Sequence, residues 1–433
     1  NHDSIIADFE KKESIQLDQD QKDAVVSALS SGTVIITGGP GTGKTTIIKC
    51  ILEIFLSLEY KVALAAPTGR AAKRMTEATG EEAKTLHRLL EYGYGEDDYE
   101  QTFERNEENP LEQDLIVIDE ASMIDTLLMN HFLKAIAPGT RIILVGDVNQ
   151  LPSVGPGNVL KDIIDSGVVK VVLLRKIFRQ AQESQIVMNA HRINSGDLPI
   201  ANEEGTDFFM LHAATQEKIR TKIIETCATR LTNYKDYDPF TDIQVITPVK
   251  KGPVGVKELN TALQGELNPP SQEKTERKFL NGLFREGDKV MQIKNNYGMK
   301  WSDEREGDGE GIFNGDIGRI QSIDESGKKV IVRFDDGKTV VYSFEQMDEL
   351  VLSYAITVHK SQGSEFNAVV MPIFKGPGML LNRNLLYTAV TRGKEMVVLI
   401  GHKPYLKFMI DNVNVNRRKT GLKERIAHDL WAD

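Results

Sequence analysis

The segment TVIITGGPGTGKTT, which occupies residues 33–46, decides the fold class of this chain. Residues 33–37 are a short β-branched run, and a helical pattern follows at 45–58. Between them, residues 38–45 match the pattern G-x-x-x-x-G-K-[ST], whose glycine-rich turn presents backbone N–H groups to phosphate oxygens. By average composition, a chance match in this length is roughly one in fifty. The segment therefore predicts a nucleotide-binding loop between a buried strand and a helix.

The residue types in this loop suit a bound triphosphate. Lys44 supplies a positive charge to the β- and γ-phosphates, and Thr45 supplies a hydroxyl ligand for Mg²⁺. The start of the following helix adds its positive end. A glycine-rich turn without a ligand is the alternative interpretation, and the flanking strand and helix argue against it. The residues expected to contact the nucleotide here are Gly39, Pro40, Gly41, Thr42, Gly43, Lys44, Thr45 and Thr46.

Strand and helix patterns alternate along much of the chain. Short apolar strands separated by helices predict parallel sheets with helices on both faces, which is an α/β fold. The first 160 residues give strands at 33–37, 61–65, 115–118 and 141–145, with helices at 45–58, 71–79 and 129–136. A second set, beginning near residue 168, gives strands at 168–174, 243–247, 368–373 and 396–401, with helices at 182–195, 215–233 and 382–391.

Other segments interrupt this alternation. Between residues 284 and 349, short β-type runs are split by Asn-Gly, Ser-Gly and Asp-Gly turns, which predicts a small all-β insert. Polar stretches at 268–277 and 302–311 are expected to be mobile. The expected domains are a first α/β domain at 1–165 with a hairpin or loop excursion at 91–114, a second at 166–283 and 350–433, and the insert at 284–349.

The composition excludes several classes of protein. With 433 residues, of which 40% are apolar and 27% charged, the chain is an ordinary globular protein rather than a fibrous or disordered one. It has no run of 18 apolar residues, so we expect no membrane span. Its two cysteines, Cys50 and Cys227, cannot build a zinc cluster or a disulfide framework, which indicates a reducing, cytoplasmic setting.

A net charge of −10 at first argues against a nucleic-acid partner. The charge is unevenly distributed, however, because residues 91–114 contain ten acidic residues and one basic residue, Arg105. That window carries −9, so the other residues are close to neutral and can still form a local basic groove. A solvated surface is the simpler interpretation of the acidic run.

The buried strand at 115–118 ends in two carboxylates, Asp119 and Glu120. Ligands gather at the carboxyl ends of parallel strands, so Asp119 is placed to hold Mg²⁺, usually through water. Glu120 can orient and deprotonate an attacking water. Alone, this pair would be an ordinary solvated strand end. Together with the phosphate loop, it predicts a Mg²⁺-dependent hydrolase in which water attacks the γ-phosphate.

Further motifs narrow the choice among such hydrolases. The chain resembles the superfamily 1 helicases in an ordered set of segments that spans nearly its whole length: Gln21, 38–45, 67–70, 119–120, 146–150, Arg179, 357–365 and 391–392. The sequences GDVNQLPSVGPG at 146–157, TVHKSQGSEF at 357–366 and LYTAVTR at 386–392 are similar to the RecD-like branch. APTGRAAKRM at 66–75 and TLHRLL at 85–90 agree with it.

The resemblance implies two RecA-like motor domains with ATP and Mg²⁺ between them, and 5′→3′ movement on single-stranded DNA. It also implies that the insert is SH3-like, and that the excursion at 91–114 is a hairpin that meets a single-strand/duplex junction. DNA repair or recombination in a bacterial cytoplasm, at the nucleoid, is the expected setting, without a membrane partner. Related chains often carry a further N-terminal region, so protein partners bound there are expected to be missing from these residues.

Single residues also acquire roles from the resemblance. Gln21 resembles the glutamine that reads adenine with its amide. The amide of Gln150, which follows a strand, is expected to sense the γ-phosphate. Arg179 and Arg392 resemble arginine fingers, which stabilise transition-state charge. Without the resemblance, Gln21 and both arginines would be ordinary surface or ion-pair residues. The remaining nucleotide contacts are Gly363, through its backbone, and Glu365, at the ribose.

Three segments at strand ends are expected to hold DNA. Hydroxyls, backbone N–H groups and basic side chains bind phosphates without reading bases. A structural histidine is an equally good interpretation of His87 and a weaker one of His359, which lies inside the motif. The expected DNA contacts are Pro67, Thr68, Arg70, His87, Arg88, Thr357, His359 and Lys360.

The sequence leaves alternatives open. The same motor could be a DNA-stimulated ATPase or translocase subunit of a larger nuclease complex, a Pif1-type or relaxase-associated helicase, or a non-enzymatic ATP-gated DNA-binding module. RNA is not excluded as the substrate. No nuclease-type carboxylate cluster is evident elsewhere in the sequence, so we expect no strand cutting by this chain. Four residues look family-like without a role that we can derive: Lys250, Lys251, Asn260 and Gln264.

Overall fold

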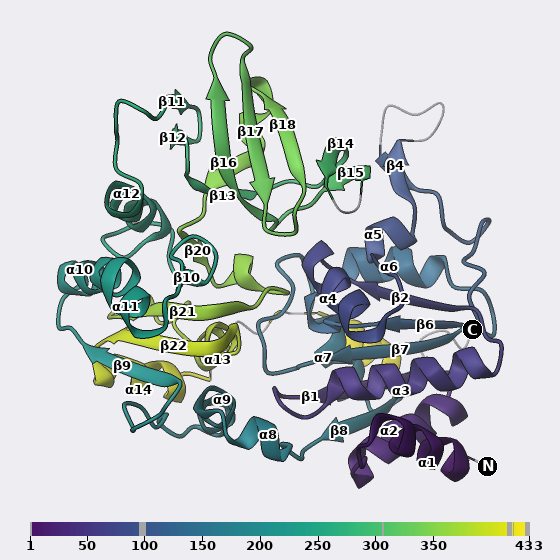
Figure 1. The fold of residues 1–433 in the computed structure, drawn as a ribbon. Coiled ribbons are helices and arrows are strands. Elements are labelled where there is room, and N and C mark those ends of the chain that lie inside the picture. The colour runs from purple at the N-terminus through teal and green to yellow at the C-terminus, as the bar shows by residue number, and fades with distance from the viewer. Residues whose placement is uncertain (1, 95–100, 305–306, 414–417, 419, 429–433) are drawn as a thin grey trace. The chain divides into compact units, whose positions relative to one another are not determined.

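Figure 1 shows the computed structural model of the chain, which forms two compact units. The first unit consists of residues 1–191 and 414–433, and the second of residues 192–413. No helix in the described part of the chain is long and apolar enough to cross a membrane. The structure describes residues 2–94, 101–304, 307–413, 418 and 420–428.

The first unit is built on a six-stranded sheet whose neighbouring strands are all parallel, in the order β3-β2-β6-β7-β1-β8. Its strands are β1 (Thr33–Gly38), β2 (Val62–Ala66), β3 (Ala83–Thr85), β6 (Leu115–Ile118), β7 (Arg141–Gly146) and β8 (Lys170–Leu174). Its helices are α1 (His2–Glu13), α2 (Gln19–Ser30), α3 (Lys44–Ser57), α4 (Gly69–Thr79), α5 (Leu86–Leu89), α6 (Thr126–Lys134), α7 (Val159–Ser166), α8 (Arg179–Gln182) and α15 (Leu422–Ala427), while α9 (Gln185–Ser195) crosses the unit boundary.

Both faces of this sheet are buried, as the continuous apolar runs predict. Val34 and Ile36 of β1 join one core cluster with Phe55 of α3, because alternate residues of a strand point to the same face. Ile35 points to the other face and joins a second cluster with Phe132 of α6. Each of these side chains is almost fully buried, which stabilises the fold by about 1.5–3 kcal/mol per residue. The predicted α/β class is confirmed.

The compact units differ in two places from the predicted domain limits, which stay a prediction. We expected the strand at 168–174 to begin the second domain, but β8 pairs in parallel with β1 inside the first sheet. The predicted limit after residue 165 therefore lies within the first unit. Sequence periodicity identifies a buried strand but not its partner, so this strand could not be assigned to a sheet in advance.

The second difference concerns the C-terminal segment, which we expected in the second domain. Its described part packs on the first unit, where α15 contacts α7. Arg418 donates hydrogen bonds to the carbonyl oxygens of Ser153, at 2.7 Å, and of Gly157, at 2.6 Å. A buried or half-buried guanidinium usually requires several acceptors, and this loop supplies them. The segment is therefore fixed to the loop that follows β7.

A hairpin leaves the first unit between α5 and β6, as predicted for the excursion at 91–114. Strands β4 (Tyr92–Tyr94) and β5 (Gln101–Phe103) pair antiparallel, and residues 95–100 of the predicted excursion lie outside the described residues. At its base, the ring centroids of Tyr92 and Phe103 are 4.6 Å apart. The ring of Phe103 also packs on His131 of α6, at 4.4 Å, so aromatic contacts hold the hairpin base to the unit.

The second unit contains a parallel sheet of five strands in the order β20-β10-β21-β22-β9. Its strands are β9 (Phe208–His212), β10 (Ile243–Thr247), β20 (Ala355–Thr357), β21 (Phe366–Ile373) and β22 (Gly393–Gly401). Its helices are α10 (Gln216–Glu225), a π-helical turn η2 (Thr226–Arg230), α11 (Leu231–Lys235), α12 (Val256–Leu267), a 3₁₀ turn η4 (His359–Ser361), α13 (Arg383–Val390) and α14 (Lys403–Asp411). The two short strands β9 and β20 were missed by the sequence analysis.

The predicted all-β insert is an antiparallel sheet of seven strands in the order β15-β14-β18-β17-β16-β13-β19. Its strands are β13 (Lys289–Gln292), β14 (Asn296–Asp303), β15 (Gly307–Ile312), β16 (Ile317–Asp324), β17 (Lys329–Phe334), β18 (Thr339–Ser343) and β19 (Leu350–Leu352). The turn η3 (Glu345–Glu349) lies between β18 and β19. A hairpin of β11 (Glu276–Phe279) and β12 (Gly282–Arg285) precedes them.

Two stretches that we expected to be mobile are therefore partly strands. Except for the turn residue Glu304, the described part of 302–311 belongs to β14 and β15, which pair with each other. Trp301 faces Gly309 across this pair, and a Cβ on that glycine would lie 2.3 Å from the indole ring. The glycine thus admits a large ring that the polar composition did not predict. Likewise, the end of 268–277 enters β11.

Asp288 ties the insert to the rest of the second unit. Its fully buried carboxylate accepts hydrogen bonds from Gln264 Nε2 at 2.6 Å, Asn268 Nδ2 at 2.8 Å and the Arg285 N–H at 2.7 Å. The hydroxyl of Tyr354 also donates to it, at 2.9 Å. Burial raises the pKa of Asp288, and these donors act against that shift. The network joins α12, the insert and the segment that leads into β20.

Replacing Asp288 with alanine should destabilise the second unit strongly, because four donors would lose a charged acceptor in a buried place. We expect the free energy of unfolding to fall by about 3 kcal/mol or more, measured by urea denaturation and circular dichroism. Asp336→Ala is the matched control, since this partly exposed residue of the same insert forms an ion pair with Lys338, two residues away. A loss below about 1 kcal/mol for both variants would contradict the role of the network.

Candidate functional site

The carboxyl edge of the first sheet gathers most of the predicted site residues. The phosphate loop follows β1, the acidic pair follows β6, and Gln150 lies in the loop after β7. Pro67 and Thr68 follow β2, and His87 lies just beyond β3. Because all of these strands are parallel, their carboxyl ends meet at one edge. The structure thus brings together five segments that are separated in the sequence.

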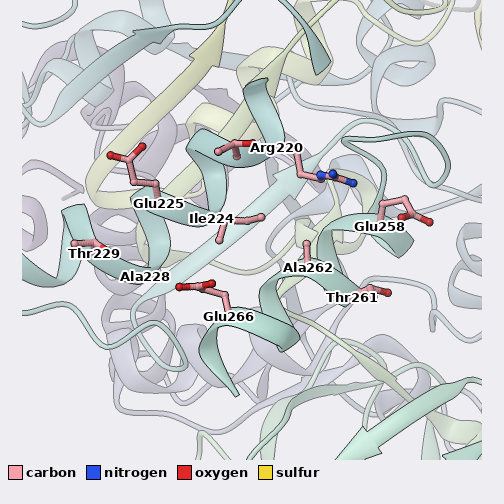
Figure 2. A pocket seen from close by; sticks show the side chains of 10 residues that line it. Arg220, Ile224, Glu225, Ala228, Thr229, Glu258, Thr261, Ala262 and Glu266 are labelled. Carbon is pink, nitrogen blue, oxygen red and sulfur yellow. The ribbon is translucent and has the colours of Figure 1, made fainter. Parts of the chain in front are cut away.

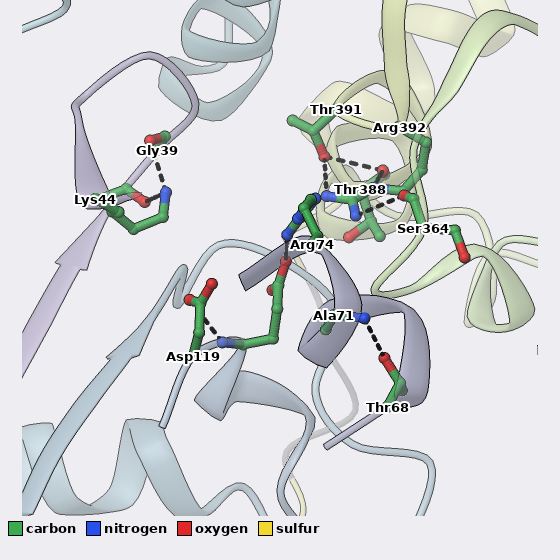
Figure 3. A network of polar contacts seen from close by, with 12 residues as sticks. Gly39, Lys44, Thr68, Ala71, Arg74, Asp119, Ser364, Thr388, Thr391 and Arg392 are labelled. Atoms are coloured by element: carbon green, nitrogen blue, oxygen red, sulfur yellow. Dashed lines mark hydrogen bonds and ion pairs between the residues drawn. The ribbon is translucent and has the colours of Figure 1, made fainter. Parts of the chain in front are cut away.

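The phosphate loop has the geometry expected of an anion site. Gly43 adopts a left-handed conformation with φ 80°, and α3 begins directly after it. No side chain of the described residues caps the N-terminus of this helix, so its first N–H groups remain available to an anion. The Lys44 ammonium donates to the carbonyl oxygens of Gly38, at 2.7 Å, and Gly39, at 2.9 Å, and so stays folded over the loop (Figure 3).

The rest of the predicted loop residues surround this turn. The buried hydroxyl of Thr42 donates to the Gly39 carbonyl at 2.8 Å and closes the loop. Thr45 is exposed in the first turn of α3, where its hydroxyl can reach a metal ion, and Thr46 is half-buried beside it. The Pro40 carbonyl lies 3.0 Å from Nε2 of His191.

A second layer of residues packs over the loop. Gln21 is buried, and its Nε2 lies 3.4 Å from the Thr42 carbonyl. The Phe178 N–H donates to the Gly41 carbonyl at 3.1 Å. A Cβ placed on Gly43 would lie 2.4 Å from Gln21 Nε2 and 3.2 Å from the Phe178 ring. Gln21 therefore lies at the loop as predicted, whereas Phe178 was missed, although it stands next to the predicted Arg179.

The acidic pair is held in a strained and desolvated place. Glu120 has φ 52° and ψ 37°, a left-handed conformation that a non-glycine residue adopts only at a cost. Its N–H donates to Asp119 Oδ1 at 2.8 Å. Burial, and then the neighbouring charge of Glu120, raises the pKa of Asp119 above its ordinary value, while the charges of Arg74 and Lys44 lower it. Such a carboxyl gains from a nearby cation, which fits a metal ligand.

Gln150 is buried with one end of its amide unsatisfied. Its Oε1 has no hydrogen-bond partner among the described residues, and the same holds for the buried hydroxyls of Thr37 and Ser122. Thr37 lies near the end of β1, and Ser122 lies two residues after Glu120 of the acidic pair. Buried polar atoms are normally paired in native proteins. These three therefore fit a site that a hydrated ligand completes.

The predicted DNA-binding segments of this unit share a local structure. Thr68 accepts a hydrogen bond from the Ala71 N–H at 3.2 Å, and Thr85 accepts one from the Arg88 N–H at 3.2 Å. Each threonine caps the helix that follows its strand, which is a favoured role for threonine. Arg70 is half-buried in the first turn of α4, and Arg88 is exposed.

His87 also has a structural role. Its ring packs against Tyr92 and Phe103 at centroid distances of 5.5 and 5.8 Å, at the base of the hairpin. Desolvation lowers its pKa, which favours the neutral ring, while the charge of Asp125 acts in the opposite direction. This packing supports the alternative interpretation, in which His87 has a structural role. DNA contact by His87 stays a prediction.

In the second unit, the predicted DNA-binding residues lie at the carboxyl end of β20. Thr357 accepts a hydrogen bond from the Lys360 N–H at 3.3 Å, which repeats the threonine turn of the first unit. The side chains of His359 and Lys360 are exposed. Partial desolvation and the charge of Lys250 lower the pKa of Lys360. Lys250, which had no assigned role, therefore forms a basic pair with it that suits a phosphate.

Gly363, Glu365 and Arg392 lie at the opposite edge of the second sheet, where β21 and β22 begin. Arg392 is 2% exposed, and its guanidinium donates to the carbonyls of Thr388 and Ser364 and to the Thr391 hydroxyl, each at 3.1 Å (Figure 3). Glu365 is exposed, and Gly363 has φ 71°. Arg392 is thus held rigidly within its own unit.

Arg179 begins α8, and its side chain lies outside the described residues. We expected this arginine on the second motor domain, but residue 179 belongs to the first compact unit. The reason is local: a Cβ on Gly41 of the phosphate loop would lie 2.6 Å from Ala181 of the same helix. Its role as an arginine finger stays a prediction.

A separate groove of about 460 Å³ lies between α10, the π-helical turn and α12 (Figure 2). Its walls carry charged side chains, including Arg220, Glu225, Glu258 and Glu266. None of the predicted site residues lines it. The groove is therefore not part of the candidate site.

Three family models match successive parts of the chain: the first unit, the insert with the segment before it, and the end of the second unit. An AAA domain matches residues 21–156, and a UvrD-like helicase C-terminal domain matches residues 352–400. Between them, the SH3 domain of the ATP-dependent RecD-like DNA helicases matches residues 259–334, which confirms the SH3-like character of the insert.

Curated relatives cover nearly the whole chain. It is 33% identical over 419 residues to the ATP-dependent RecD2 DNA helicase of Deinococcus radiodurans, a match that covers 96% of this chain and 54% of that protein. It is 30% identical over 440 residues to the RecBCD enzyme subunit RecD of Mycolicibacterium smegmatis, covering 94% of this chain and 75% of that subunit. The chain thus spans about half the length of the first relative.

Among solved structures, the Pif1 helicase from Bacteroides, crystallised with ADP-AlF3 and single-stranded DNA, is similar to this chain. Its TM-score is 0.53 at 20% identity, and the match covers 89% of this chain and 92% of that chain. At this identity the likeness supports the fold alone.

Gly43→Ala should abolish nucleotide binding, because the new Cβ meets both Gln21 and Phe178 at the loop. We expect the variant to lose most of the rise in thermal midpoint that a bound nucleotide gives. Gly80→Ala is the matched control, since Gly80 has the same φ of 80° and nothing within 4 Å of its Cβ position. It should keep the nucleotide-dependent rise. Equal behaviour of the two variants would contradict the assignment of the loop.

Proposed function

The chain belongs to the RecD-like helicase family, and we propose that it is an ATP-dependent DNA helicase that moves 5′→3′ along single-stranded DNA. The observation that carries the proposal is the shared edge of the first sheet, where the phosphate loop, the acidic pair and Gln150 meet. These residues supply the positive charge, the proton acceptor and an amide for the γ-phosphate, which suits phosphoryl transfer to water. We place this activity in DNA repair or recombination, in the cytoplasm at the nucleoid.

The nucleotide is proposed to be ATP with Mg²⁺, held by residues of the first unit. Lys44 and the N-terminus of α3 neutralise phosphate charge, and the Phe178 ring offers an apolar face beside Gln21 for the base. Thr45 and Asp119 would hold Mg²⁺, which supplies Lewis-acid stabilisation of the phosphate oxygens. Two observations support binding of this nucleotide: the Oε1 of Gln150 has no partner among the described residues, and no described side chain caps the N-terminus of α3.

Glu120 is proposed as the general base that orients the attacking water and accepts a proton from it, and Gln150 is proposed to sense the γ-phosphate with its amide. Arg179 and Arg392 are proposed to stabilise the charge that spreads over the γ-phosphate oxygens in the transition state. Gly363 and Glu365 are proposed to contact the nucleotide through backbone and ribose. For Arg392, support comes from the three hydrogen bonds that orient its guanidinium.

DNA is proposed to lie along the threonine turns of both units. Thr68, Arg70, Arg88, Thr357 and Lys360 present hydroxyls, N–H groups and positive charges that bind phosphates without reading bases. The remaining proposed contacts are Pro67, His87, His359 and Lys250. Because such contacts are largely electrostatic, binding should weaken with salt. We propose that the β4–β5 hairpin meets the junction between single strand and duplex.

A second candidate function keeps the motor without independent unwinding: a DNA-stimulated ATPase or translocase that serves as one subunit of a larger complex. The observation that favours it is the 30% identity to a RecBCD enzyme subunit, of which this chain covers 75%. The name of that relative describes a subunit rather than a complete enzyme.

Strand displacement on 5′-tailed and 3′-tailed duplexes tests the two candidates side by side. We expect ATP-dependent unwinding of the 5′-tailed duplex only, and no activity on either duplex for Lys44→Ala, because that change removes the positive charge that binds the phosphates. Unwinding of only the 3′-tailed duplex would overturn the proposed direction. DNA-stimulated ATP turnover without unwinding would favour the subunit candidate, and no turnover at all would leave only a binding module.

The two proposed arginine fingers can be tested by separating turnover from affinity. Arg179→Ala and Arg392→Ala should each lower kcat by about 10³-fold or more while nucleotide affinity changes little, because such fingers act on transition-state charge. Arg392→Lys keeps the charge but loses the planar fork, so it should rescue turnover only partly. Circular dichroism checks that the buried Arg392 position tolerates each change. Turnover within tenfold of the wild type for both alanine variants would refute the assignment.

A further inference from the structure

Arg74 and Glu120 form an ion pair within the first unit that no sequence motif predicted. The Arg74 Nη2 lies 2.8 Å from Glu120 Oε1, although the two residues are 46 positions apart in the chain. The Glu120 side chain is 9% exposed to solvent, and the Arg74 side chain is 33% exposed. Partial burial makes such a pair stronger than one at the open surface. Figure 3 labels Arg74, and a dashed line there marks its contact.

The ion pair engages the residue proposed as the general base. The Arg74 guanidinium donates to Oε1 of that carboxylate, so this oxygen has less room and fewer lone pairs for the attacking water. Glu120 is also fixed from its backbone, because its N–H is bonded to Asp119 and its conformation is left-handed. While Arg74 holds Oε1, this residue is therefore poorly placed to deprotonate water.

Arg74 lies on the helix whose first turn is proposed to hold DNA. Thr68 caps α4 at that end through the Ala71 N–H. Arg70 and Arg74 are four residues apart, about one turn, so they share a face of the helix. Met75 is buried on another side and anchors the helix in the unit. A DNA phosphate at Arg70 would thus lie one turn from the cation that holds Glu120.

Resting on the proposed DNA-dependent hydrolysis, we propose that Arg74 is a positioning residue that restrains Glu120 until single-stranded DNA occupies the first turn of α4. A phosphate bound there offers Arg74 a competing anion. Arg74 then leaves the carboxylate, and Glu120 becomes free to accept a proton from the attacking water. The ion pair is the link through which DNA stimulates turnover.

ATP turnover of the full chain, with and without oligothymidylate, tests this link in four proteins: the wild type, Arg74→Ala, Arg74→Lys and Lys73→Ala. Arg74→Ala should raise DNA-free kcat by about fivefold or more, the low end of ordinary coupling between sites, and leave DNA-saturated kcat near the wild-type value. Arg74→Lys should restore the low DNA-free rate, because an ammonium can also pair with Glu120. Lys73 is the exposed neighbour on α4, so Lys73→Ala should behave as the wild type.

The outcomes separate this proposal from the proposed function. A DNA-free rate that stays unchanged in Arg74→Ala, or turnover that falls equally with and without DNA, would overturn the restraint. A wild-type chain whose turnover ignores DNA would instead count against the DNA-dependent motor itself.

DNA binding without nucleotide gives a second readout that needs no turnover. Glu120→Gln weakens the ion pair and frees Arg74, so it should bind oligothymidylate several-fold more tightly than the wild type in fluorescence anisotropy. The double variant Glu120→Gln/Arg74→Ala should lose that gain, because the freed cation is then missing. Equal affinity of Glu120→Gln and the wild type would overturn the proposal, even if Arg74→Ala alone folds poorly.

Discussion

The parallel pairing of β2, β6, β7 and β1 is the constraint on which the rest of the first unit depends. Thr37 pairs with Gly146, and Ile118 pairs with Leu144, so the strands end at nearly the same level. Each strand is buried on both faces, and a slip of one residue would turn its side chains to the wrong face. Hydrophobic packing therefore fixes the register, and the register fixes where the polar residues meet.

That meeting place concentrates charge where water is scarce. Two carboxylates, Asp119 and Glu120, lie with the cations Lys44 and Arg74 in a region that burial already makes costly for an isolated charge. The strained backbone of Glu120 persists because its N–H is bonded and its side chain is paired. The strain and the ion pair thus belong to one arrangement, which holds a reactive carboxylate in a defined state.

The second unit shows how an inserted domain is fixed without disturbing the sheet. Asp288 joins the insert to α12 and to Tyr354, which directly precedes β20. Asn260 binds both backbone groups of Ala355 in β20, at 2.8 and 3.0 Å. The strand that carries Thr357 is therefore anchored from two sides. Asn260 and Gln264, whose roles the sequence did not reveal, act here as supports of that strand.

Most of the longer helices and strands, and all of the motifs, could be recognised from the amino-acid sequence alone. Glycines at a strand–helix turn, a carboxylate pair after an apolar strand and Asn-Gly or Asp-Gly turns each carry a local physical cause, so they can be recognised before folding. The folded chain was needed to show that β8 joins the first sheet, that Phe178 packs over the phosphate loop, and that Arg74 reaches Glu120. Those outcomes depend on contacts between residues far apart in the chain, and no local pattern records which distant surface a strand or side chain will meet.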